Sequence, residues 1–146
     1  MTEKERLNEK HESSKLAEYM SLSSDPRPHP LCHCHAIVAG NHSESVALRA
    51  ILAWLAMRID DPRNGCWLPA NTAARDKMPQ WLKKAIPHSR VHRRSYYRWL
   101  EDRINLATTT SLELLTSELK MIRTRLQTGA IPDEILLELG YEVRMI

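Results

Sequence analysis

Three groups of polar residues in this chain have the types and the spacing of a metal site. They are residues 33–35 (His-Cys-His), the turn-forming pair Asn64 and Gly65, and the pair His88 and His92. Residues four apart on a helix lie on one face about one turn apart, so His88 and His92 are close enough to hold one ion. The pattern predicts a metal centre built from a strand end, a turn and a helix.

The stretch around the histidine pair is basic. Residues 75–103 hold nine lysines and arginines against three acidic residues, although the net charge of the whole chain is only +3. Such side chains bind phosphate groups without regard to nucleotide sequence. The alternative is a solvated helix face that binds nothing. The candidate phosphate contacts are Lys83, Lys84, Arg90, Arg93 and Arg94.

The elements that would position these residues can be read from the pattern of apolar residues. We expect a strand over residues 32–39, ending at Gly40, and a helix over residues 43–57. A turn at residues 60–65 leads to a short strand over residues 66–68, which Pro69 ends. A helix over residues 88–107 follows, because Pro87 suits the position before a first turn.

The two ends of the chain have a different character. Residues 1–30 are predicted to be a charged arm and a proline-rich linker, because Pro26, Pro28 and Pro30 stop any helix. Residues 110–126 and 132–139 are predicted to form two further helices. The chain has 146 residues, which suits one domain with an appendage.

The composition bears on compartment and redox state. There is no apolar run of the roughly twenty residues that span a bilayer and no apolar segment near the N-terminus. We therefore expect no membrane association and a cytoplasmic protein, or one delivered to a target cell without a cleavable signal. Cys32, Cys34 and Cys66 are a poor disulfide framework. They are predicted to be reduced thiols, with a structural zinc site alongside His33 and His35 as the alternative.

The order strand, turn, strand and helix, with these residues in place, resembles the AHH family, a nuclease family of the HNH/endonuclease VII group in the His-Me finger superfamily. The resemblance covers residues 31–104. It implies an α+β fold with a small ββα-metal core in residues 31–106 and surrounding helices, including a helical extension over 107–146. It is carried by residues 35–40 (His-Ala-Ile-Val-Ala-Gly), 59–61 (Ile-Asp-Asp) and 64–69 (Asn-Gly-Cys-Trp-Leu-Pro), and by His88, His92, Tyr96 and Tyr97.

The resemblance implies a role for each polar residue. His35 is the general base, a metal ligand, or both, and Asn64 braces the base or orients a ligand. His88 and His92 hold one divalent ion with His35, and this ion polarises the scissile phosphate and stabilises the leaving oxygen. The predicted catalytic set is thus His35, Asn64 and His88. Zn²⁺, Ni²⁺ and Mn²⁺ suit histidine ligands and Mg²⁺ favours oxygen, so the ion stays open.

The sequence departs from the family pattern at one position. The family name refers to Ala-His-His, but the aligned residues here are Cys34, His35 and Ala36. Ala36 therefore replaces the second histidine, which is usually the base. We favour His35 as the base; His33, two residues away on the same strand face, is another substitute. The alternative is that His35 stays a ligand and the protein is an inactive relative that binds metal and a protein or nucleic acid.

The predicted activity is metal-dependent hydrolysis of phosphodiester bonds in DNA, with RNA as the second substrate. A bacterial toxin-type nuclease with an immunity protein as partner is implied by the resemblance alone. The oligomeric state stays open. A third hypothesis is a helical interaction protein that binds no metal, in which case a chelator leaves its stability unchanged.

Overall fold

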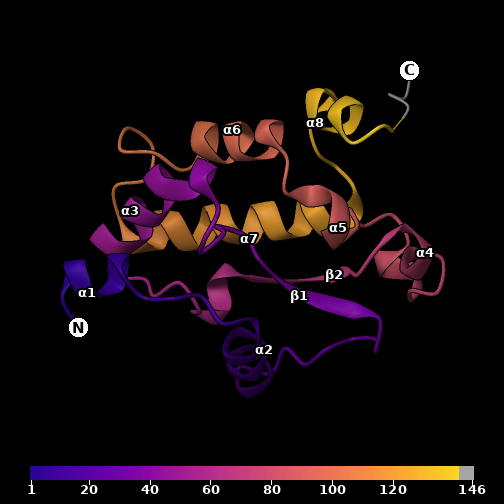
Figure 1. Cartoon of the computed structure of the whole chain (residues 1–146), viewed down its shortest axis with the longest axis horizontal. Helices are drawn as coiled ribbons and strands as arrows, with labels where there is room; N and C mark the ends of the chain where they lie inside the picture. The colour runs from indigo at the N-terminus through magenta and orange to yellow at the C-terminus, as the bar shows by residue number, and fades with distance from the viewer. Residues whose placement is uncertain (142–146) are drawn as a thin grey trace.

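The computed structural model describes residues 1–141, and its centre is a pair of antiparallel strands (Figure 1). Strand β1 (Cys32–Ala36) pairs with β2 (Gly65–Pro69), and His35 lies opposite Cys66 in the register. Helix α3 (Val46–Trp54) lies in the connection between the strands. The mixture of helices with a two-stranded sheet confirms the predicted α+β class.

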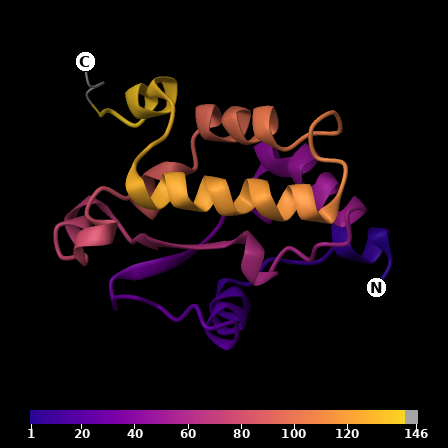
Figure 2. The same ribbon diagram turned by 180° about the vertical axis from the view of Figure 1, so that it is seen from behind.

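Two helices flank the strands (Figures 1 and 2). Helix α2 (Ser13–Leu22) packs along β1, and the long helix α7 (Leu112–Thr128) packs along β2. Two strands alone cannot form a core, so they depend on the apolar faces of both helices. The buried residues of α7 recur every three or four positions, as expected for one helix face: Leu115, Leu119, Ile122 and Leu126.

Gly65 permits the close approach of α2 to the sheet. A Cβ atom at this position would overlap the sulfur of Met20 and stand 3.2 Å from Leu16 Cδ1. Leu16 and Met20 are both completely buried. Part of the segment that the sequence predicted to be a charged arm therefore contributes to the core, and α1 (Glu3–Leu7) precedes it.

The first strand is shorter than predicted, because Asn64 takes over its pairing after Ala36. The backbone oxygen of Asn64 accepts from Ile37 N at 2.8 Å, and its side-chain oxygen accepts from Val38 N at 2.9 Å. The Asn64 amide nitrogen donates to Val38 O at 3.1 Å and to Ile59 O at 2.9 Å. One buried side chain thus ties the end of β1 to the turn before β2.

The single helix predicted over residues 88–107 is wrong. The structure has α5 (His88–Val91) and α6 (Arg94–Arg103), with a break at His92 and Arg93. His92 has φ −77° and ψ 66°, and Arg93 is extended. The break allows Val91 in α5 and the tyrosines of α6 to be buried together. This packing depends on the tertiary structure, so the local spacing of apolar residues does not predict it.

The remaining elements agree with the sequence. Helices α7 and α8 (Asp133–Glu138) match the two predicted C-terminal helices, and the short α4 (Thr72–Arg75) lies between β2 and α5. None of the helices within residues 1–141 is long and apolar enough to cross a membrane. The division into an arm, a core and an extension stays a prediction.

Replacing Asn64 with alanine tests the tie at the end of β1. Asn64→Ala leaves the backbone groups of Val38 and Ile59 without their buried partner, so we expect the free energy of unfolding to fall by about 2–4 kcal/mol. Urea unfolding measures the change. The exposed Asn41 offers a matched control, and Asn41→Ala should change stability by less than about 0.5 kcal/mol. Equal effects of the two variants would contradict the assigned role.

Candidate metal centre

Three of the predicted ligands converge at the junction of the sheet with α5. His35 comes from β1, His88 begins α5, and His92 follows the end of α5. One ring nitrogen from each residue lies within 4.8 Å of the other two. His35 is completely buried, His88 is half-buried and His92 is exposed. The cluster therefore has a closed inner end and an open outer end.

The hydrogen bonds of Tyr96 determine which ring nitrogen of His35 carries the proton. The Tyr96 hydroxyl donates to Ile37 O at 2.7 Å, so its oxygen is free to accept from His35 Nε2 at 3.0 Å. The proton of the neutral ring then lies on Nε2, and Nδ1 carries a lone pair. Within residues 1–141, this buried Nδ1 has no hydrogen-bond partner. A buried lone pair without a partner, in a cluster with two other imidazoles, fits a metal ion.

The outer two histidines also have a hydrogen-bond partner at Nδ1. His92 Nδ1 lies 2.7 Å from the Tyr97 hydroxyl, and His88 Nδ1 lies 3.0 Å from His33 Nδ1. Nε2 of His88 and Nε2 of His92 lie 3.4 Å apart. Two nitrogens that each bind one tetrahedral ion at about 2.0–2.1 Å are also roughly 3.4 Å from each other. Three histidines with an open side form the ligand set of a catalytic rather than a structural site.

Electrostatics keep these rings neutral. Burial lowers the pKa of His35 well below its usual value, and the neighbouring His88 and His92 lower it further. Burial and His92 lower the pKa of His88 to about 4, and burial lowers the pKa of His92. Only the neutral imidazole has a lone pair for a metal, so the site favours the form that binds.

The cysteines are not part of this cluster. Cys32 packs its sulfur 3.5 Å from the sulfur of Met78, and Cys34 makes the same contact with Met20. Burial raises the pKa of all three thiols, that of Cys34 to about 12. In the part of the chain that the structure describes, the metal-type cluster contains histidines alone. The thiols behave as small buried hydrophobic groups rather than as ligands.

The predicted phosphate contacts divide between two surfaces. Arg93 and Arg94 are exposed beside His92, where α6 begins. Arg90 lies over the ring of Tyr141. Lys83 and Lys84 line a separate hollow near the end of α7, away from the histidines. The structure therefore brings only part of the basic stretch to the metal centre.

Asn64 does not contact the histidines, because its polar atoms bond to the backbone of Val38 and Ile59. His42, which the motifs do not mark as a site residue, stacks on Tyr97 with ring centres 4.5 Å apart. His11 also reaches the site, and it lies 49 residues from its partner Asp60 in the chain. Position beside the Gly40 turn is the one signal for His42, and no local pattern marks His11.

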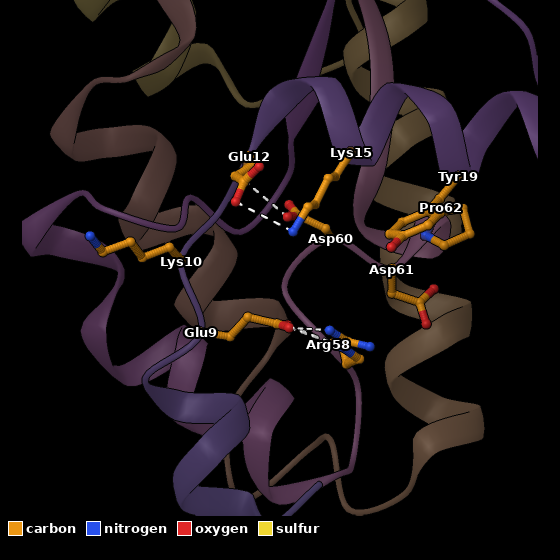
Figure 3. A pocket seen from close by; sticks show the side chains of 9 residues that line it. All are labelled: Glu9, Lys10, Glu12, Lys15, Tyr19, Arg58, Asp60, Asp61 and Pro62. Atoms are coloured by element: carbon orange, nitrogen blue, oxygen red, sulfur yellow. Dashed lines mark hydrogen bonds and ion pairs between the residues drawn. The ribbon is translucent and has the colours of Figure 1, made fainter.

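Two hollows lie near the sheet. The one lined by His88, His92, His42 and His11 has a volume of about 400 Å³. The other, drawn in Figure 3, has a volume of about 350 Å³ and contains opposite charges that pair with each other. Arg58 bonds to Glu9 there, and Lys15 lies 3.4 Å from Glu12. The first hollow is therefore lined by four histidine rings, whereas the second contains two cation–carboxylate pairs.

Comparison with known families agrees with this geometry. Residues 16–127 match the AHH family, a nuclease family of the HNH/ENDO VII superfamily with conserved AHH.

The chain belongs to the AHH nuclease family.

The match begins in α2 and ends in α7, so it extends beyond both ends of the resemblance predicted from the motifs. No curated protein and no solved structure matches the chain. Residues 34–36 of this AHH chain are Cys-His-Ala. Membership establishes a nuclease family, and the residue roles rest on the geometry.

Removing the Tyr96 hydroxyl should weaken metal binding. Tyr96→Phe releases the proton of His35 Nε2, so the ring is no longer held with Nδ1 towards His88 and His92. Loss of such a supporting hydrogen bond typically lowers metal affinity by about 10–100-fold. Calorimetric titration with Zn²⁺ measures the change. The half-exposed Tyr19 provides a control, since Tyr19→Phe should leave the affinity as it is; equal affinities for both variants would refute the orientation.

The metal-free protein should lose stability in mild acid. The pKa of His88 is about 4 in the fold against 6.5 when unperturbed, so between these values the unfolded chain binds a proton that the native state does not. The full stability is therefore present above pH 6.5 and falls as the pH is lowered towards 4. Urea unfolding with EDTA should show a smaller fall in His88→Gln. An identical pH dependence in both proteins would be evidence against a buried neutral His88.

Proposed function

We propose that the chain is a metal-dependent endonuclease that hydrolyses phosphodiester bonds of DNA, with RNA as the second substrate. The observation that carries the proposal is the buried Nδ1 of His35, which is directed to a cluster with His88 and His92 and lacks a partner among residues 1–141. Membership in the AHH nuclease family supports the reaction class. The mild basic charge beside His92 supports an anionic substrate.

His35, His88 and His92 would hold one divalent ion. When bound, such an ion polarises the scissile phosphate and stabilises negative charge on the leaving oxygen. Tyr96 keeps Nδ1 of His35 unprotonated, and Tyr97 holds the ring of His92 through a hydrogen bond at Nδ1. Arg93 and Arg94 follow directly in the chain and can bind flanking phosphates at the open side.

We infer that His35 is a ligand rather than the general base. Its side chain is 0% exposed, so water that attacks a substrate cannot reach it from solvent. Its Nε2 proton is donated to the Tyr96 hydroxyl, and its other nitrogen, Nδ1, belongs to the ligand cluster. A base in this enzyme must therefore come from another residue. The expected role of Asn64 is to fix the end of β1, which places His35.

Family membership also supports an extension of the proposal. We propose that the protein acts as a bacterial toxin-type nuclease and is neutralised by an immunity protein. The second candidate function is a metal-binding relative without activity, which binds a protein or nucleic acid; Ala36, in place of a histidine of the conserved triplet, favours it. The two functions share the metal centre and differ in cleavage.

Plasmid cleavage tests the proposed activity. Purified protein with Mg²⁺, Mn²⁺, Ni²⁺ or Zn²⁺ should nick supercoiled DNA, and EDTA should abolish nicking. We expect His35→Ala and His92→Ala to lose at least about 100-fold in rate, because each removes one of three ligands. His29→Ala, outside the cluster, is the matched control. A labelled RNA of the same length ranks the two substrates.

The outcomes separate the candidate functions. Binding of one metal ion per chain without cleavage of DNA or RNA would contradict the nuclease proposal and favour the inactive relative. Absence of metal binding, with no effect of EDTA on the free energy of unfolding, would contradict both and favour a helical interaction protein.

A further inference from the structure

The hollow beside the metal ligands contains a second histidine system. His11, in the segment between α1 and α2, lines this hollow together with His88 and His92. Its side chain is 15% exposed, so it is held in place but open to solvent. Ala36 and Ala39 line the same hollow and carry no polar side-chain group. His11 is therefore a candidate for the missing proton acceptor.

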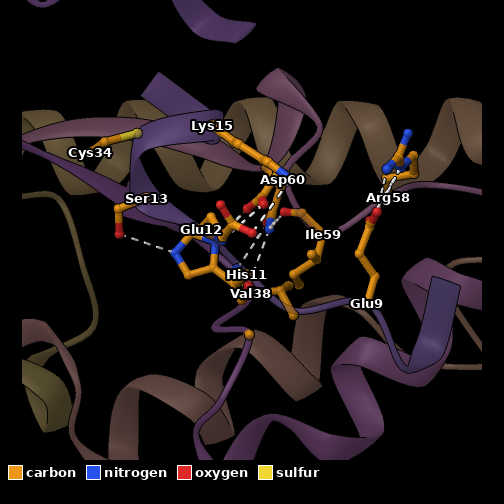
Figure 4. A network of polar contacts seen from close by, with 12 residues as sticks. Glu9, His11, Glu12, Ser13, Lys15, Cys34, Val38, Arg58, Ile59 and Asp60 are labelled. Carbon is orange, nitrogen blue, oxygen red and sulfur yellow. Dashed lines mark hydrogen bonds and ion pairs between the residues drawn. The ribbon is translucent and has the colours of Figure 1, made fainter. Parts of the chain in front are cut away.

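Asp60 determines which nitrogen of His11 can accept a proton. His11 Nδ1 is paired with Asp60 Oδ1, and the other carboxylate oxygen accepts from Glu12 N at 2.9 Å (Figure 4). Because an ionised carboxylate only accepts, the proton of the neutral His11 ring lies on Nδ1. Nε2 then carries the lone pair, and it lies 3.5 Å from the hydroxyl of Ser13, which also lines the hollow.

The fold reserves space for this histidine. A Cβ atom on Gly40 would overlap the Cβ of His11, and it would stand 3.3 Å from the His11 Cα. Asp60 is itself only 8% exposed and lies just before the turn that carries Asn64. The segment after β1 and the segment before β2 thus hold His11 and its carboxylate together, although they are far apart in the sequence.

The other histidines near the hollow are less suited to accept a proton. His42 Nδ1 accepts from Glu44 N at 3.1 Å, which places the proton of the neutral ring on Nε2, the nitrogen that remains. His33 is exposed and has its Nδ1 against His88. His11 is thus the histidine whose partner is a carboxylate and whose remaining nitrogen carries a lone pair.

We propose that His11 is the general base of the nuclease and that Asp60 is its positioning residue, an inference that rests on the proposed function. His11 Nε2 takes a proton from a water molecule as the water oxygen forms a bond to phosphorus. The bond from phosphorus to the 3′ oxygen breaks with its electron pair, and that oxygen takes a proton from solvent. The products are a 5′ phosphate and a 3′ hydroxyl, and His11 returns its proton to solvent.

The test compares cleavage with metal binding in the same full-length proteins. His11→Ala and His11→Gln should cleave plasmid DNA about 100-fold or more slowly than the wild type with Mn²⁺, which is the usual effect of losing a general base. Both should bind Mn²⁺ with an affinity within about twofold of the wild type, because His11 is not a ligand. His29→Ala controls for loss of a histidine. Added imidazole should restore part of the rate in His11→Ala.

A spectroscopic measurement tests Asp60 without reference to activity. Long-range nitrogen–proton correlation in the wild type should find the neutral His11 ring with its proton on Nδ1. Asp60→Asn should abolish that preference and slow cleavage, with unchanged metal affinity. A proton on Nε2 in the wild type would overturn the proposal, since that nitrogen could not then accept one.

Failure of this inference can be distinguished from failure of the proposed function. If the wild type does not cleave with any metal, both the proposed nuclease function and the assignment of His11 as its general base are contradicted. If the wild type cleaves and His11→Gln cleaves within tenfold of it, the nuclease stands and the role of His11 is overturned. Loss of metal binding in both His11 variants would also overturn the role of His11 as a base, because His11 would then affect cleavage through the metal ligands.

Discussion

The imidazole of His35 is the constraint around which the rest of the site is arranged. It is buried on β1, and a buried polar ring costs free energy unless both nitrogens are satisfied. Tyr96 satisfies one nitrogen and at the same time depends on Ile37 O for its own proton. The second nitrogen is directed to His88 and His92, so α5 must dock at this end of the sheet. The break before α6 follows, because Tyr96 has to reach back to the strand.

A two-stranded sheet cannot hold such a ring by itself, which explains why the family match extends well past the metal motifs. It includes α2, whose Leu16 and Met20 cover the sheet next to Gly65, and it ends at Gln127. The side-chain nitrogen of Gln127 donates to Trp67 O on β2 at 3.1 Å. The helices that flank the sheet thus support the strands that position His35.

The sequence was sufficient for the features that depend on local spacing. The strands, the turn at Asn64 and the C-terminal helices follow from apolar periodicity and turn residues, and the grouping of His35, His88 and His92 follows from motif order. The break at His92 could not be predicted, because it arises from burying residues of two helices at once. The pair His11 and Asp60 could not either, since residues 49 positions apart meet only through the fold. Asn64 was expected at the site, but its bonds hold the backbone behind it.

The gradient of burial across the three histidines has a consequence for the kinetics of ion exchange. His35 forms the closed floor of the cluster and His92 its exposed rim, so an ion held by the three histidines would enter and leave past His92 without opening the core. Loading after folding would then be a surface event, and release would begin at the outermost ring. The lifetime of an ion bound there would then depend on how firmly the Tyr97 hydroxyl and the stacked ring of His42 restrain that outer ring.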